Sequence, residues 1–168
     1  MVGRTAKTAL KPGFSIDSAF WTRFGAARYF FAMTTPTARE VLEQLRSRTI
    51  ENDPSVGDLY AEDGAFELPF APPGVPKALN GGEAIREHLK KSVAASQARW
   101  SDFTVTAVYD TADPEVLVAE YVLDATIQAT GDPFRLGSII VLKVRDGKIV
   151  LSRTYANPIQ TAEAHKYD

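Results

Sequence analysis

The chain contains no cysteine among its 168 residues and only two histidines. Disulfides, thiolate metal ligands and a cysteine nucleophile are therefore excluded. A zinc or iron site would need mostly carboxylate ligands, and no clustered ligand spacing occurs. No apolar run approaches the roughly 18 to 20 residues that a membrane-spanning helix needs. We therefore expect no metal, no cofactor and no membrane insertion, and we assign the protein to the cytoplasm.

The net charge of −2 hides an asymmetry between the two ends of the chain. Residues 1–32 contain five basic residues and one acidic residue, Asp17. Subtracting these from the totals of 19 basic and 21 acidic residues leaves 14 and 20 for residues 33–168, a formal charge of −6. Polyanion binding needs a cationic surface, so we expect no nucleic-acid partner.

Residues 1–32 are expected to be an extension outside the domain. They contain many aromatic residues and have a basic, acid-poor character that faintly resembles a transit peptide. We favour a start of translation at Met33 over a targeting role for this segment. Alternatively, the segment folds as a short helix against the domain or a partner. With 45% hydrophobic residues the chain can bury one core. We expect one domain over residues 33–160 and a tail over 161–168.

Two helices are predicted in the first half of the domain. Thr35 or Thr37 can cap a helix from about Pro36, and Glu40 completes a capping box with Thr37. Its apolar stripe includes Val41, Leu42 and Leu45. A helical turn over Val56–Tyr60 and a second helix over residues 83–96 are also predicted.

Strands dominate the second half of the domain. A brief strand precedes the Pro-rich loop Pro69–Pro76, which forbids regular structure. The predicted strands are Ala65–Leu68, Trp100–Tyr109, Glu115–Gln128, Phe134–Val144 and Ile149–Tyr155. Asp146-Gly147 is a strong hairpin signal.

Helices followed by a meander of long strands indicate an α+β fold, with the helices packed on one face of a mixed or antiparallel sheet. Strands of ten to fourteen residues are long, so the sheet should curve strongly, with bulges. A curved sheet closed by helices leaves one cone-shaped cavity.

Several motifs, in order along the domain, resemble the nuclear transport factor 2-like superfamily, especially its SnoaL-like polyketide-cyclase and phenazine-biosynthesis A/B branches. The matching segments are Leu59–Gly64, Gly82–His88, Asp113-Pro114, Asp146–Ile149 and Tyr155–Ile159. The resemblance covers about Thr37 to Ala164. It implies this fold, in its cystatin-like form, and a homodimer formed through the sheet, but the fold serves isomerases, cyclases, hydrolases and binding subunits alike.

The steroid-isomerase pattern is not preserved. By resemblance, its tyrosine and its two acids fall near Leu45, Leu68 and Ile140, which are all apolar. An enolising mechanism needs a base and an oxyanion donor. We therefore do not expect a steroid isomerase of that design.

The phenazine-type pattern is preserved in part and supplies the candidate catalytic residues. Asp63 matches its acidic residue before the first strand, His88 matches its helix histidine, and Thr154 replaces its late glutamate. His88 would transfer a proton, since imidazole titrates near neutrality. The alternatives are a surface histidine for His88 and a turn-forming role for Asp63.

Strand alternation and the resemblance together predict the pocket lining. Val150, Ser152, Thr154 and Ala156 share one face of the last strand. The predicted pocket residues are Tyr60, Phe66, Trp100, Phe103, Ser138, Ile140, Leu142, Ser152 and Thr154. Glu120 and Asp124 face either solvent, as amphipathicity favours, or the cavity, as the resemblance suggests.

The sequence therefore leads to two functional hypotheses. In the first, the protein binds a small apolar or polycyclic molecule and acts on it as a cofactor-independent isomerase, cyclase or hydratase by general acid/base chemistry. In the second, it is a ligand-binding or protein-interaction module without chemistry.

Overall fold

The structure is a computed structural model that describes residues 34–160. The predicted extension over residues 1–32 and the tail over 161–168 lie outside the described residues. The elements are α1 (Ala38–Ile50), the 3₁₀ helix η2 (Pro54–Leu59), β1 (Tyr60–Glu67), β2 (Ala78–Asn80), α2 (Gly82–Ala95), β3 (Ala98–Asp110), β4 (Val116–Ile127), β5 (Pro133–Arg145) and β6 (Lys148–Ala156).

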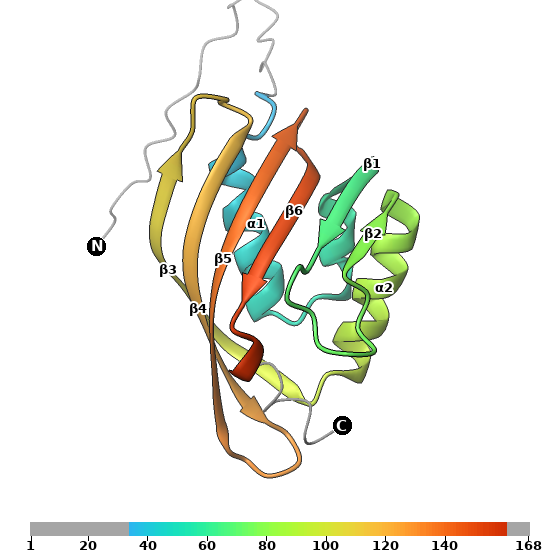
Figure 1. The fold of residues 1–168 in the computed structure, drawn as a ribbon, viewed down its shortest axis with the longest axis vertical. Coiled ribbons are helices and arrows are strands. Elements are labelled where there is room, and N and C mark those ends of the chain that lie inside the picture. The colour runs from blue at the N-terminus through green and yellow to red at the C-terminus, as the bar shows by residue number, and fades with distance from the viewer. Residues whose placement is uncertain (1–33, 161–168) are drawn as a thin grey trace, which may run out of the picture. The chain divides into compact units, whose positions relative to one another are not determined.

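The strands form one six-stranded sheet in the order β2-β1-β6-β5-β4-β3. β1 runs parallel to β6, and every other pairing is antiparallel. Figure 1 shows the bent, unclosed sheet with α1 behind its centre and α2 beside β1 and β2. The predicted α+β fold with a curved mixed sheet is confirmed.

Local signals in the sequence fix the start of α1. Thr37 is the N-cap, and its hydroxyl accepts a hydrogen bond from the backbone N–H of Glu40. The Glu40 carboxylate accepts one from the backbone N–H of Thr37 at 2.7 Å. The predicted capping box is therefore present, and it places Val41 and Leu42 on the buried side of the helix.

The β5–β6 hairpin turns at the dipeptide that predicted it. Asp146 and Gly147 have φ values of 51° and 72°. Positive φ at both central residues is the type I′ pattern, whose twist matches that of the flanking strands. The turn pairs Arg145 with Lys148 and sets the register of the two strands.

The structure corrects three details of the sequence analysis. β1 begins at Tyr60 and not at Ala65, because Tyr60 already pairs with Ile149 before a break in register. The short strand β2, which pairs antiparallel with β1, was not predicted. Val150 does not continue the inner face of β6, because a shift in the β5–β6 register buries Ile149 instead.

Glu120 and Asp124 lie on the outer face of the sheet, which is the solvent alternative. Their neighbours Tyr121 and Leu123 are buried on the inner face. The Tyr109 hydroxyl donates a hydrogen bond to Glu120 at 3.1 Å, and Arg135 pairs with Asp124.

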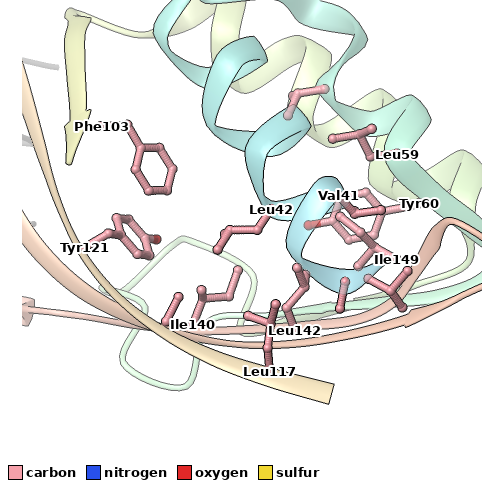
Figure 2. Close-up of a cluster of buried hydrophobic side chains, with 14 of the residues drawn as sticks. Val41, Leu42, Leu59, Tyr60, Phe103, Leu117, Tyr121, Ile140, Leu142 and Ile149 are labelled. Carbon is pink, nitrogen blue, oxygen red and sulfur yellow. The ribbon is translucent and has the colours of Figure 1, made fainter. Parts of the chain in front are cut away.

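One end of the inner face is packed solid against α1. Val41 and Leu42 meet Leu117, Leu142 and Ile149 in a single core cluster (Figure 2). All five side chains are at most 2% exposed. This end of the sheet is therefore a conventional hydrophobic core.

Gly147→Ala is expected to lower the free energy of unfolding by about 2 kcal/mol. Alanine resists positive φ, and its Cβ would lie 2.7 Å from Pro36 Cδ. Gly131→Ala is the matched control, because Gly131 has a φ of 77° with no heavy atom within 4 Å of such a Cβ. It should cost about 1 kcal/mol. Urea unfolding checks both, and equal losses would refute the Pro36 contact.

Candidate functional site: a hollow between the sheet and the helices

A cavity of about 550 Å³ lies at the other end of the inner face. Strands β1 and β3 to β6 supply its walls together with the C-terminal parts of α1 and α2. Its lining is mainly apolar, and two polar regions interrupt it: a floor of hydroxyl groups and a mouth near the ends of the helices. The volume lies in the range of small-molecule sites.

The structure brings most of the predicted pocket residues to this cavity. Its lining includes Tyr60, Phe66, Trp100, Phe103, Ile140, Ser152 and Thr154. Ser138 and Leu142 do not line it. Leu142 belongs to the solid core, and Ser138 lies buried beside the cavity with an Oγ that makes no well-aligned hydrogen bond within the described residues.

Sequence reasoning missed several lining residues. Tyr121, Leu123 and Ile127 come from β4, Phe134 and Leu136 from β5, and Leu89 and Val93 from α2. The signal was present in the period-two alternation of β4, where every second residue is buried. The pattern alone does not show which of these buried residues face a hollow and which face other side chains.

The first hydroxyl pair on the floor joins β1 to β6. The Tyr60 Oη and the Ser152 Oγ lie 2.7 Å apart, and both residues are at most 4% exposed. Burial raises the pKa of the Tyr60 hydroxyl well above its ordinary value of 10.0, and the hydrogen bond with Ser152 offsets part of that rise. Tyr60 is therefore a neutral hydrogen-bonding group at physiological pH.

A second hydroxyl group comes from Tyr121, whose ring stacks on Phe103 at 4.3 Å between centroids. Burial raises the pKa of the Tyr121 hydroxyl, and the neighbouring hydroxyls of Ser138 and Thr154 partly offset this. In Figure 2 the hydroxyl oxygens of Tyr60 and Tyr121 each point toward the middle of the cluster. The floor thus carries phenol and alcohol groups.

The charged groups of the cavity lie at its mouth, where they are already engaged. Arg48 donates to the backbone oxygen of Ser55 at 2.7 Å, and Asp53 accepts from the backbone N–H and the hydroxyl of the same serine. Asn52 ties the end of α1 to β3 by bonding both the N–H and the carbonyl of Trp100. These contacts fix the positions of the polar side chains at this edge of the cavity.

His88 does not belong to the cavity lining. On α2, Leu89, Ser92 and Val93 face the cavity, whereas the His88 ring lies behind Phe66 with 6.1 Å between ring centroids. Its Nε2 lies 3.5 Å from the Ser92 hydroxyl. The catalytic role of His88 stays a prediction, and the geometry does not place its proton near a bound molecule.

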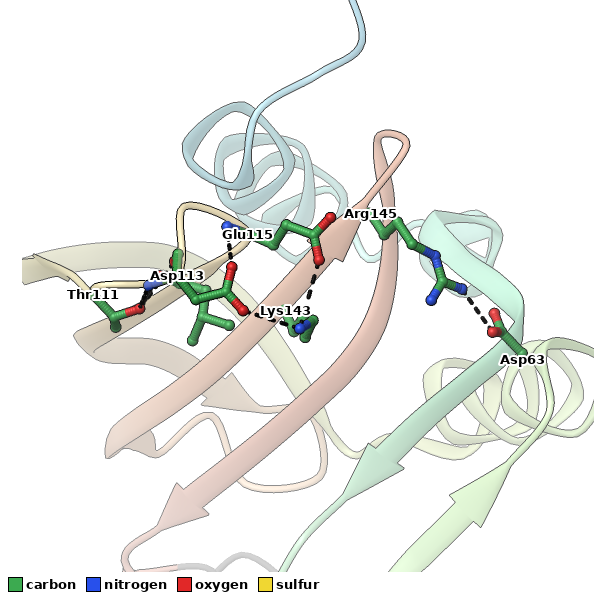
Figure 3. A network of polar contacts seen from close by, with 7 residues as sticks. Asp63, Thr111, Asp113, Glu115, Lys143 and Arg145 are labelled. Atoms are coloured by element: carbon green, nitrogen blue, oxygen red, sulfur yellow. Dashed lines mark hydrogen bonds and ion pairs between the residues drawn. The ribbon is translucent and has the colours of Figure 1, made fainter.

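Asp63 lies on an exposed stretch of β1 and is held by an arginine. Arg145 donates to its carboxylate at 2.6 Å (Figure 3). This hydrogen bond holds the pKa of Asp63 below its ordinary value. Asp63 does not line the cavity. Its catalytic role also stays a prediction, and its contacts are those of a surface ion pair.

Within residues 34–160, no group of three histidine, aspartate or glutamate side chains is arranged to hold a metal ion. None of the helices described is long and apolar enough to cross a membrane.

Residues 38–152 match the model of the SnoaL-like domain. The chain belongs to the SnoaL-like family. It is 38% identical over 128 residues to the uncharacterised protein YesE of Bacillus subtilis, covering 76% of this chain and 86% of the relative. It is 33% identical over 129 residues to an uncharacterised PhzA/B-like protein of Pseudomonas aeruginosa, covering 76% and 89%. The predicted family resemblance is therefore confirmed.

Solved structures agree with the family assignment. A "Putative Isomerase from Bacillus subtilis" superposes with a TM-score of 0.71 at 36% identity, covering 78% of this chain and 94% of that one. A phenazine biosynthesis-related protein of Pseudomonas aeruginosa (TM-score 0.56, 21% identity, coverage 76% and 83%) shares the fold alone. So does an epoxide hydrolase of M. tuberculosis (0.57, 16%, 76% and 87%).

The two buried tyrosines predict how stability depends on alkaline pH. Because folding raises the pKa of each hydroxyl, the unfolded chain loses the proton near pH 10 while the folded chain keeps it. Stability should therefore be complete below pH 10 and fall above it, by up to about 1.4 kcal/mol per pH unit for each group. Urea unfolding between pH 9 and 11 should show a shallower fall for a Tyr60→Phe/Tyr121→Phe variant. An unchanged slope would contradict the assignment.

Proposed function

We propose that this protein binds a mainly apolar small molecule in the cavity between its sheet and helices. The observation that carries the proposal is a hollow of about 550 Å³ with aromatic and aliphatic walls and a few convergent polar groups. Sites that take small organic molecules have this size and composition. A domain of this length could have filled the same space with side chains, since protein interiors are normally close-packed.

The comparisons support a role in small-molecule binding or chemistry. The relatives that share this fold are named as a "Putative Isomerase", as a phenazine biosynthesis-related protein, as a PhzA/B-like protein and as an epoxide hydrolase. These names differ in reaction type. They therefore support a small-molecule ligand more than they support any one reaction. Function on a shared fold depends on the side chains of the site.

Ligand binding has firmer geometric support than catalysis. General acid/base chemistry needs a titrating group within hydrogen-bond reach of the reacting atoms. His88 and Asp63 are not lining residues, and the raised pKa values of Tyr60 and Tyr121 keep both hydroxyls protonated near neutrality, so neither is available as a base. A cofactor-independent isomerase, cyclase or hydratase remains the alternative, favoured by the 36% identity to the structure named as an isomerase.

Filling the cavity should abolish ligand binding. Val93→Trp places a large ring on the lining of α2, and Ala94→Trp places the same ring on the exposed side of that helix. Native mass spectrometry of the purified protein should show a bound small molecule that is lost in the first variant and kept in the second. His88→Gln should also keep it. A molecule that stays bound to Val93→Trp would refute the cavity as the site.

We propose further that a second copy of the chain covers the outer face of the sheet. Ile139 and Tyr109 are 42% and 52% exposed there, among the partly exposed valines of β4 and β5. Ion pairs lie around this apolar area. Arg135 pairs with Asp124. Lys143 pairs with Asp113 and Glu115 (Figure 3). An apolar centre with a polar rim is typical of protein interfaces.

Ile139→Glu should convert a dimer into a monomer, because it would place two buried carboxylates across a symmetric interface. Light scattering at micromolar concentration should give twice 18.4 kDa for the wild type and 18.4 kDa for the variant. Ile159→Glu, at a residue that is 71% exposed beyond β6, should stay dimeric. A monomeric wild type would refute the dimer without affecting the cavity.

A further inference from the structure

We infer that the cavity selects an uncharged ligand with a hydrogen-bond-accepting oxygen, such as a carbonyl oxygen, and binds that oxygen at the hydroxyl floor. The inference rests on the proposed function, because it specifies the chemistry of the molecule that the same cavity would hold. The observations that carry it are the Tyr60–Ser152 pair, the adjacent Tyr121–Thr154 group and the position of the charged lining residues.

The Tyr60–Ser152 pair has one more hydroxyl proton than its hydrogen bond uses. Tyr60 and Ser152 each have one O–H, and among residues 34–160 the only hydrogen bond of either side chain is the one that joins the two at 2.7 Å. That bond uses one proton, whichever group donates it. One O–H donor therefore remains at the floor, and a buried donor without an acceptor is costly. A ligand oxygen with free lone pairs is a suitable partner.

The second hydroxyl group lies close to the first along β6. Ser152 and Thr154 are two residues apart on β6, so their side chains lie on the same face, about 7 Å apart. Tyr60 reaches the first, and the Tyr121 hydroxyl lies by the second. The floor therefore presents two neighbouring polar points in an otherwise apolar wall. They would orient a rigid polycyclic molecule by its oxygen.

The floor of the cavity offers no partner to a charged ligand. Among the described lining residues, only Arg48 and Asp53 are charged, and both are bound to Ser55 at the mouth. A carboxylate or ammonium group at the floor would lose its hydration without gaining an opposite charge, which is unfavourable. The tyrosines themselves stay protonated there, as expected where the surroundings disfavour charge.

Three tricyclic probes of similar shape test the inference: fluorene has no oxygen, 9-fluorenone has a neutral carbonyl and fluorene-9-carboxylate is an anion. Trp100 lies in the cavity wall, so quenching of tryptophan fluorescence reports binding. We expect fluorenone to bind about fivefold more tightly than fluorene, as one neutral hydrogen bond contributes. The carboxylate should bind at least tenfold more weakly than fluorenone.

Variants of the floor identify the atoms responsible. Tyr60→Phe and Thr154→Val should each reduce the preference for fluorenone over fluorene while leaving the fluorene affinity within twofold. Tyr109→Phe is the matched control, because its hydroxyl bonds Glu120 on the outer face of the sheet. It should keep the full preference. Thr154→Val preserves side-chain shape and supplies the test if Tyr60→Phe is poorly folded.

Equal affinities for fluorene and fluorenone would overturn the inference and leave cavity binding intact. Tighter binding of the carboxylate would overturn it as well, as would a fluorenone preference that survives in both floor variants. If none of the three probes binds, or if all bind equally well to Val93→Trp, the proposed function fails and the inference fails with it.

Discussion

The structure depends on a mismatch in length between its strands and the helix that covers them. β5 has 13 residues and extends about 44 Å, whereas α1 also has 13 residues but is only about 20 Å long. A single helix therefore covers about half of the inner face of the sheet. α2 and the bend of the sheet enclose the remainder, and their side chains do not reach far enough to fill it.

This mismatch divides the interior into two ends with different chemistry. Leu117 and Leu142 pack against α1 at one end, and Leu123 and Leu136 face the hollow at the other. The hydroxyl floor lies among the strands between these ends. Tyr60 and Tyr121 belong at once to the core cluster and to the cavity wall, so the same burial that stabilises the fold keeps their hydroxyls neutral.

The polar chemistry of the site differs from what the family resemblance implied. The positions where relatives of the steroid-isomerase type would carry a tyrosine and two acids are apolar here, and Leu45, Leu68 and Ile140 all contribute to the cavity wall. Two of the three phenazine-type residues persist in sequence, but Asp63 forms an ion pair with Arg145 and the His88 ring packs beside Phe66. At the third phenazine-type position, Thr154 has a hydroxyl group where a carboxylate would be needed for proton transfer.

The sequence by itself determined the local elements: the Thr37 capping box, the Asp146-Gly147 turn, the order of helices before strands and the alternation that buries one face of β4. Each depends on residues close together in the chain, where a few backbone angles and one hydrogen bond decide the outcome. The tertiary structure alone decided that Val150 is displaced by a register shift and that Tyr60 meets Ser152, 92 residues away. It also decided that Leu89, and not His88, lines the cavity. Those outcomes depend on strand pairing and on how far helices reach across a bent sheet, and residue pattern encodes neither.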